Sequence, residues 1–315
     1  MNIIDVERRN DLDALKDNLK FHDINQTDED GYSLLHIAIM NNNIDITRFL
    51  VENYININIV NRDLNTPLHL SIILNKIGIF KYLVRNNADL NMKNKDGETP
   101  IMLAVRLNRS EMVEILLSYD VNLSYSNNKD ENIAFLAIRS NNLALIETLV
   151  NLDPTILHSR NYQNDTLLHE AIKRKNLEIA SYLIKKGILV NIVNDDEETP
   201  LFYAARNNDI DAASFLVDNK AIIRFKNRFN ETIFDIGSER FNDYMLFKEN
   251  SRGYLNFLNE NQLVVDIITN DLESFLTHID KIKAHKKDDY GLKAIDYARS
   301  YNRQKMVEIL KDYSK

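Results

Sequence analysis

Residues 61–72 read NRDLNTPLHLSI, and this stretch is rewritten along the chain at an almost constant interval. Similar stretches are DEDGYSLLHIAI at 28–39, NKDGETPIMLAV at 94–105, NYQNDTLLHEAI at 161–172 and NDDEETPLFYAA at 194–205. One recurring position has intervals of 33, 33, 33, 34, 33 and 33 residues and is occupied by His36, His69, Met102, Phe135, His169, Phe202 and Asp235. A fixed period of this length indicates a repeat protein, in which each unit packs on its neighbours.

Within one period the residues predict two helices. Thr66 suits the N-cap of a first helix, and Pro67 suits its first turn because a proline needs no N–H partner there. Asn75 and the lysine after it break the chain, and Ile79 and Leu83 then have the i, i+4 spacing of a second helix. The other periods follow the same order of turn, short helix, second helix and return loop.

A turn, a T-P-L-H start and two helices in each period resemble the ankyrin repeat family. The resemblance implies an all-α ankyrin-repeat solenoid of about ten helix-turn-helix repeats. We expect one domain over 1–315 with five parts: an N-cap repeat at 1–28, regular repeats at 29–234, a degenerate repeat at 235–263, a further repeat at 264–288 and a C-cap repeat at 289–315. Polar caps at both ends would leave no room for an appended catalytic or membrane domain.

The degenerate repeat follows from an irregular interval near the C-terminus. Between Asp235 and Asp296 lie 61 residues, which Val264 divides into intervals of 29 and 32. Aromatic residues gather around this shortened unit: Phe225, Phe229, Phe241, Tyr244, Phe247, Tyr254 and Phe257. Either they refill the core of a distorted repeat, or they form a second contact surface through which the chain could also dimerise.

Composition argues against several classes of partner. The net charge of −8 and pI of about 5.5 do not suit a phosphate backbone or an anionic membrane, so we expect no nucleic-acid binding. No run of 18 apolar residues predicts membrane insertion, and the absence of cysteine excludes disulfides and thiolate chemistry. The charged N-terminus has no secretory signal. We therefore expect a cytoplasmic protein, or alternatively one delivered into a host cell without such a signal.

Histidines and carboxylates are the remaining candidates for chemistry. His36, His69 and His169 occupy the T-P-L-H slot, where the resemblance implies hydrogen bonds from the imidazole to turn backbone and cap side chains. No phosphate-binding loop, zinc motif or kinase signature is present. The sequence therefore predicts no catalytic residue, metal site or cofactor. The alternative is an enzyme whose carboxylates Glu239, Asp243 and Glu249 meet near the degenerate repeat.

The resemblance places partner contacts on loop tips and on the concave, inner face of the first helices. Four residues after the recurring position, four consecutive repeats carry a base: Arg106, Arg139, Lys173 and Arg206. Four residues before it, six consecutive repeats carry an acid: Glu98, Glu131, Asp165, Glu198, Glu231 and Glu260. The two rows either pair as an exposed ladder worth about 0 to 1 kcal/mol per pair, or present the bases to an acidic partner.

Toward the N-terminus the same positions turn apolar. The predicted protein-binding residues are Tyr32, Met40, Ile73, Leu74, Glu98, Arg106, Leu107, Arg139, Lys173 and Arg206. Exposed apolar groups on neighbouring repeats mark a contact surface. We expect a non-enzymatic, monomeric interaction module that binds a protein partner on its concave face as scaffold, adaptor or inhibitor. The alternative is an effector that an intracellular bacterium or a virus delivers to bind a host protein.

Overall fold

The computed structural model describes residues 10–250, 262–269, 271–279, 284–287, 293–300 and 303–313. Throughout these residues the regular secondary structure is helical, and the only β-type pairing is three isolated bridges, such as Thr27 with Ser33. The predicted all-α class is therefore confirmed. The chain's contacts divide it into two compact units, Met1–Asp153 and Pro154–Lys315.

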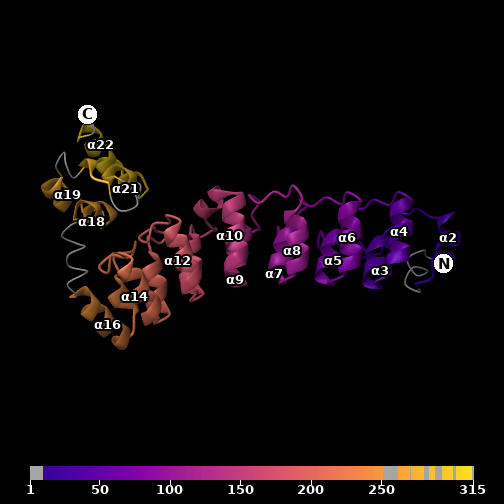
Figure 1. Cartoon of the computed structure of the whole chain (residues 1–315), viewed down its shortest axis with the longest axis horizontal. Helices are drawn as coiled ribbons and strands as arrows, with labels where there is room; N and C mark the ends of the chain where they lie inside the picture. The colour runs from indigo at the N-terminus through magenta and orange to yellow at the C-terminus, as the bar shows by residue number, and fades with distance from the viewer. Residues whose placement is uncertain are drawn as a thin grey trace. The chain divides into compact units, whose positions relative to one another are not determined.

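The first unit is built from pairs of short helices (Figure 1). After α2 (Leu12–Leu19) the helices are α3 (Leu34–Met40), α4 (Ile44–Glu52), α5 (Pro67–Ile73), α6 (Ile77–Arg85), α7 (Pro100–Arg106), α8 (Ser110–Leu117), α9 (Ile133–Arg139) and α10 (Leu143–Leu152). Each first helix packs on its own second helix and on the first helix of the next repeat, so α5 contacts α6 and α7. First helices therefore stack along one side of this unit and second helices along the other.

The start of α5 shows why a first helix begins where it does. Thr66 is the N-cap, and its backbone N–H donates to His69 Nδ1 while the His69 N–H donates to Thr66 Oγ1, both at 3.3 Å. The other imidazole nitrogen, Nε2, lies 3.2 Å from the carbonyl oxygen of Glu98 in the next repeat. One side chain thus closes its own helix and holds the following turn.

Ser33 with His36 and Thr166 with His169 repeat this arrangement. The predicted role of the three slot histidines is therefore confirmed. Where the slot holds Met102 or Phe202 the imidazole is missing, and the hydroxyls of Thr99 and Thr199 are buried with no hydrogen-bond partner among the described residues.

The second unit continues the pattern after the 3₁₀ helix η1 (Pro154–His158). Its α-helices are α11 (Leu167–Lys173), α12 (Leu177–Lys185), α13 (Pro200–Arg206), α14 (Ile210–Asp218), α15 (Ile233–Ile236), α16 (Glu239–Glu249), α18 (Gln262–Thr269), α19 (Leu272–His278), α21 (Ala294–Ser300) and α22 (Gln304–Tyr313). None of the described helices is long and apolar enough to span a membrane.

Distortion in the described part of the degenerate repeat lies in its first helix. α15 has 4 residues where α11 and α13 have 7, and α16 has 11. The C-cap of α15 is Gly237, and this position suits glycine because a Cβ there would lie 2.5 Å from the ring of Phe241, which is fully buried. Tyr254, Phe257 and Glu260 lie outside the described residues, as do the first nine residues of the predicted N-cap repeat.

Candidate protein-binding site

The turn before each first helix is organised by one asparagine. In the repeat of α7, Asn94 Oδ1 accepts from the backbone N–H of Asp96 and of Glu98, both at 3.0 Å. The same bonds are made by Asn61, Asn127, Asn161, Asn194 and Asn227. Because the amide bonds the backbone N–H of the residue four positions later, that residue has the same place in the turn in these six repeats.

That fixed position carries the acidic row, and in three repeats the acid binds the arginine of the basic row. Arg106 donates from Nε to Glu98 Oε1 at 2.7 Å and from Nη2 to Glu98 Oε2 at 2.8 Å. Glu98 is 3% exposed, whereas the Arg106 side chain keeps 45%. Hydrogen bonding to Glu98 raises the pKa of Arg106. The base therefore covers the acid and faces solvent.

Glu131 with Arg139 and, in the second unit, Glu198 with Arg206 repeat this pairing. Arg139 Nη1 lies 2.9 Å from Glu131 Oε2, and both carboxylates are 1% exposed. The predicted pairs are thus confirmed, but the description of an exposed ladder was wrong because the acids are buried. Removing one partner of a buried pair costs about 3–5 kcal/mol, against about 0–1 for an exposed pair.

The predicted pair between Asp165 and Lys173 does not form. Asp165 Oδ1 instead accepts from the hydroxyl of Tyr203 at 2.8 Å and from Nδ2 of Asn194 at 2.9 Å. Lys173 is exposed, and its Nζ lies 5.7 Å from the centroid of the Tyr203 ring. Two neutral donors from the next repeat thus satisfy this buried carboxylate, and the lysine faces solvent without it.

The apolar part of the predicted site lies on the ends of neighbouring first helices in the first unit. We call Met40, Ile73 and Leu74 the apolar patch; they are 42%, 36% and 37% exposed. Met40 ends α3 and Ile73 ends α5, which packs beside it. Arg109 donates to the carbonyl oxygens of Ile72 and Ile73 at 3.4 Å, which holds this end of α5 in place.

Two predicted contact residues are less accessible. Leu107 is half-buried, and Tyr32 is half-buried with its ring edge-on to the imidazole of His36 at 5.7 Å. Glu98 is shielded by Arg106. On the first unit a partner would therefore meet the apolar patch, Arg106 and part of Arg139.

Burial also sets the protonation of the slot histidines. Desolvation lowers the pKa of His36, His69 and His169 to about 4, while hydrogen bonds to backbone carbonyls oppose the shift. These rings are neutral at physiological pH. They are held inside the repeat and are unsuited to act on a ligand at the surface.

The carboxylates of the enzyme alternative do not meet in one place. Glu249 is paired with Arg224, whose Nε lies 2.8 Å from Oε1, while Glu239 and Asp243 are exposed on α16. Among the described residues, no group of three or more His, Asp or Glu side chains could hold a metal ion. The three carboxylates that the enzyme alternative required therefore do not converge in a cleft.

Within the aromatic cluster the outcome is mixed. Phe225 and Phe241 are buried, as refilling of the core predicts, whereas Phe229 and Phe247 are 63% and 71% exposed. Tyr244 is half-buried, and its hydroxyl donates to Ser214 Oγ at 3.1 Å. Neither hypothesis accounts for all described members.

Comparison with known proteins supports what the geometry indicates. The family model for ankyrin repeats (3 copies) matches residues 3–94, 75–159 and 137–227, more than half of the chain. The chain belongs to the ankyrin repeat family. Ankyrin repeat domains are in general protein–protein interaction modules. No curated protein sequence matches the chain.

Solved ankyrin repeat domains share this fold. The ankyrin repeat domain of human ASB11 is 21% identical with a TM-score of 0.59, and the alignment covers 70% of this chain and 99% of that chain. The ankyrin repeat domain of Bcl-3, described as a unique member of the IkappaB protein family, is 22% identical with a TM-score of 0.59 over 69% and 100% of the two chains. At these identities the likeness shows the ankyrin fold alone.

The role of the turn asparagines was not predicted from the sequence, although these residues shape the turns that carry the acidic row. A signal was present, because asparagine recurs eight residues before the slot in six successive repeats, from Asn61 to Asn227. Only the hydrogen bonds show what the signal means. Asn194 and Asn227 also donate from Nδ2 to the acid of the preceding repeat, at 2.9 and 3.2 Å.

Proposed function

We propose that this ankyrin repeat protein is a non-enzymatic binding module, acting as scaffold, adaptor or inhibitor, whose partner lies along the concave face of its first helices. The apolar patch supports the proposal most strongly. Three large apolar side chains, Met40, Ile73 and Leu74, remain 36–42% exposed on adjacent helix ends, although the repeats bury apolar residues on both helices. Adjacent exposed apolar groups are typical of protein contact surfaces.

The arginines of the same face suit a partner with acceptor groups. Arg106 donates to Glu98 from Nε and Nη2, so the N–H groups of Nη1 are not bound to that acid. Its guanidinium is already held in one plane, so a partner's carbonyl or carboxylate would meet an ordered donor and little side-chain entropy would be lost on binding. Arg106 and the apolar patch thus form a small anchor of the kind that dominates interface energy.

In the second unit, Lys173 and Arg206 are both positive but differ in whether their charge is already paired. Arg206 is bound to Glu198, whereas Lys173 forms no ion pair among the described residues and rests near the Tyr203 ring. An acidic group on a partner would therefore gain most from Lys173. The absence of cysteine fits action in a reducing compartment such as the cytoplasm.

Affinity capture with paired variants tests the proposal. The tagged chain is compared with a patch variant, Met40→Glu, Ile73→Glu, Leu74→Glu, in a lysate of the source organism, and captured proteins are identified by mass spectrometry. A matched control, Tyr54→Glu, Tyr119→Glu, Leu152→Glu, changes three exposed apolar residues that lie outside the first helices. Circular dichroism confirms that all three chains are folded.

A protein that the native chain and the control capture, and that the patch variant loses, supports the proposal. Equal capture by the patch variant moves the contact surface away from the first helices and refutes it. Loss with both variants also refutes it, because any three added charges would then have the same effect.

A further inference from the structure

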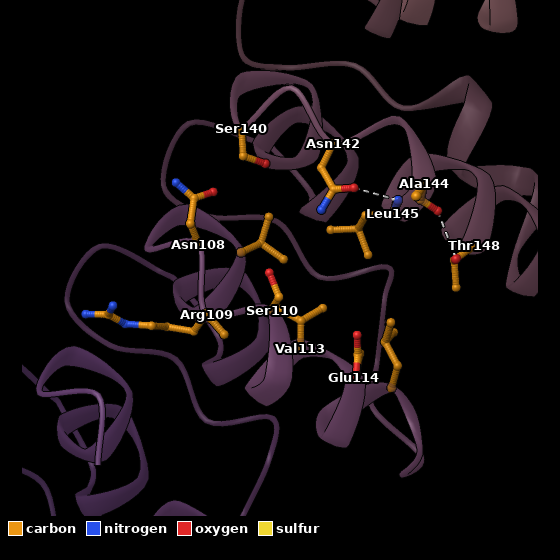
Figure 2. A pocket seen from close by; sticks show the side chains of 13 residues that line it. Asn108, Arg109, Ser110, Val113, Glu114, Ser140, Asn142, Ala144, Leu145 and Thr148 are labelled. Carbon is orange, nitrogen blue, oxygen red and sulfur yellow. Dashed lines mark hydrogen bonds between the residues drawn. The ribbon is translucent and has the colours of Figure 1, made fainter. Parts of the chain in front are cut away.

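A cleft of about 330 Å³ opens in the first unit between the second helices α8 and α10 (Figure 2). Residues 108–110 and Asn142, in the turns that lead into these helices, border it. Its apolar wall is formed by Val113 and Leu117 of α8 and Leu145 of α10. The cleft shares none of its lining with the apolar patch or with the arginine pairs.

A short side chain on α10, where other repeats have a large one, explains the cleft. The sixth residue of the second helix is large in the other regular repeats: Phe49 in α4, Tyr82 in α6, Ile115 in α8, Tyr182 in α12 and Phe215 in α14. In α10 this residue is Thr148, which is short and turns its hydroxyl back to the carbonyl oxygen of Ala144 at 2.9 Å. The space that an aromatic ring takes elsewhere is therefore open here.

Tyr82 shows what the large residue does in a complete pair of repeats. It is half-buried, and burial raises the pKa of its hydroxyl, with Glu52 and Arg48 of the preceding second helix near enough to affect it electrostatically. A ring at this position thus reaches across to the helix before it. In α10 the equivalent residue is Thr148, which has no ring to reach α8.

The junction between α6 and α8 carries a charged bridge that the junction between α8 and α10 lacks. Lys81 of α6 binds Glu111 of α8, with 2.6 Å between Nζ and Oε1. One repeat later the equivalent residues are Glu114 and Ala144, so no pair can form. Glu114 lines the cleft, is exposed, and has no ion-pair partner among the described residues. Glu147, the equivalent residue of α10, is exposed and does not line the cleft, so Glu114 is the acid that a ligand there would meet.

We propose that this cleft binds an aromatic side chain of a partner protein, from a segment in which a basic residue adjoins the aromatic one. The ring would take the place left by Thr148 and pack on Val113, Leu117 and Leu145, and the adjoining cation would pair with Glu114. Aromatic rings bring a large apolar area, and unlike charges at the rim select the partner's sequence. The site is lined mainly by α8, α10 and the turns before them, and it can be tested separately from the contact proposed above because no residue of the apolar patch or the arginine pairs lines it.

Methyl NMR of the full chain tests this site directly. Acetyl-Tyr-Lys-amide is titrated while the methyl groups of Val113, Leu117 and Leu145 are followed. We expect saturating shifts with a Kd on the order of millimolar, as one buried ring allows. Acetyl-Ser-Lys-amide should give no saturating shift, and acetyl-Tyr-Glu-amide should bind at least about threefold more weakly because its carboxylate meets Glu114.

Variants that fill the cleft provide the decisive control. Thr148→Tyr supplies the ring that α6 and α12 carry at this position and should abolish the shifts. Ala144→Leu, on the same wall, serves the same purpose should that variant not fold. Ile115→Tyr adds the same phenol at the equivalent position of α8, outside the cleft, and should leave the titration unchanged. Glu114→Gln should remove the preference for the lysine peptide.

The proposal is overturned if the native chain shows no saturating shifts at these methyl groups, or if acetyl-Ser-Lys-amide produces the same shifts. Shifts that persist in a folded Thr148→Tyr or Ala144→Leu chain would overturn it as well, because the peptide would then bind elsewhere.

Discussion

At the scale of single residues, burial decides what the charged rows do. Glu98, Glu131 and Glu198 are at most 3% exposed, and each is neutralised by an arginine eight residues later. A carboxylate without water needs such a partner, because desolvation disfavours its charged form. The arginines therefore contribute to stability whether or not they bind a partner, and the proposed binding role would belong to the same side chains.

Replacing Arg106 and Lys173 separates these roles. Arg106→Ala leaves Glu98 buried and unpaired and should lower the free energy of unfolding by about 1–3 kcal/mol, less than for a fully buried pair because the arginine is partly exposed. Lys173→Ala should change it by less than about 0.5 kcal/mol. Urea unfolding followed by circular dichroism measures both. Equal changes in the free energy of unfolding would contradict a stabilising role of the pair between Arg106 and Glu98.

Leu64 offers a second test, of backbone strain. It has φ of 56° and is 46% exposed at a turn where the equivalent residues of other repeats are Gly31, Gly97, Asp130, Asn164, Glu197 and Asn230. Left-handed backbone costs a leucine about 1–2 kcal/mol, whereas asparagine tolerates it better.

We therefore expect Leu64→Asn to raise the melting temperature, by an amount equivalent to about 0.5–1 kcal/mol. Leu64→Ala removes the same exposed side chain without favouring this conformation and should bring no such gain. A melting temperature of Leu64→Asn at or below that of the Ala variant would contradict the explanation.

At the scale of helices, the residues that recur in nearly every repeat gave the most accurate predictions of where helices begin. Thr66, Pro67 and His69 placed the start of α5 correctly, because capping depends on neighbours within three residues. Burial of the acids could not be read in this way, since it depends on a turn that Asn94 and its equivalents shape. Asp165 binds Tyr203, which lies 38 positions away in the sequence, and not the predicted Lys173. Such contacts require the packing of one repeat on the next.

Met102 lies in α7, the first helix of its repeat, and the cap of this helix is incomplete. The Thr99 hydroxyl is buried with no hydrogen-bond partner in the described part of the chain, and the residue three positions later has no ring nitrogen to meet it. Met102→His should restore the capping arrangement of α5 and raise the free energy of unfolding by about 0.5–1.5 kcal/mol, the net value of one hydrogen bond. Met102→Gln, similar in length, controls for loss of the thioether. A histidine variant no more stable than the glutamine variant would refute this explanation.

At the scale of the whole molecule, the slot histidines make stability depend on pH. Their pKa is about 4 when folded and about 6.5 when unfolded, so below pH 6.5 the unfolded chain binds protons that the folded chain does not. Each histidine should therefore withdraw up to about 1.4 kcal/mol of stability per pH unit as pH falls from 6.5 toward 4.

Urea midpoints at pH 7.5, 6.5, 5.8 and 5.0 would measure this loss. We expect little change between the first two values and a steep decline afterwards. His69→Gln should be less stable at pH 7.5 but lose stability less steeply below pH 6.5, because one proton fewer is taken up on unfolding. Parallel curves for the two chains would show that His69 does not titrate differently in the folded and unfolded states.

The arginine–glutamate pairs also constrain how this surface can change over generations. A mutation that exchanges Arg106, Arg139 or Arg206 alters the proposed contact face and leaves a buried carboxylate unpaired in the same step, so selection for a new partner would act against the fold. Such a change becomes neutral only after, or together with, a second mutation at the acid. Lys173, whose acid is already satisfied by Tyr203 and Asn194, is released from that coupling. In a lineage that adapts to new partners, position 173 should therefore diverge early, and the three arginines should be retained or lost jointly with their glutamates.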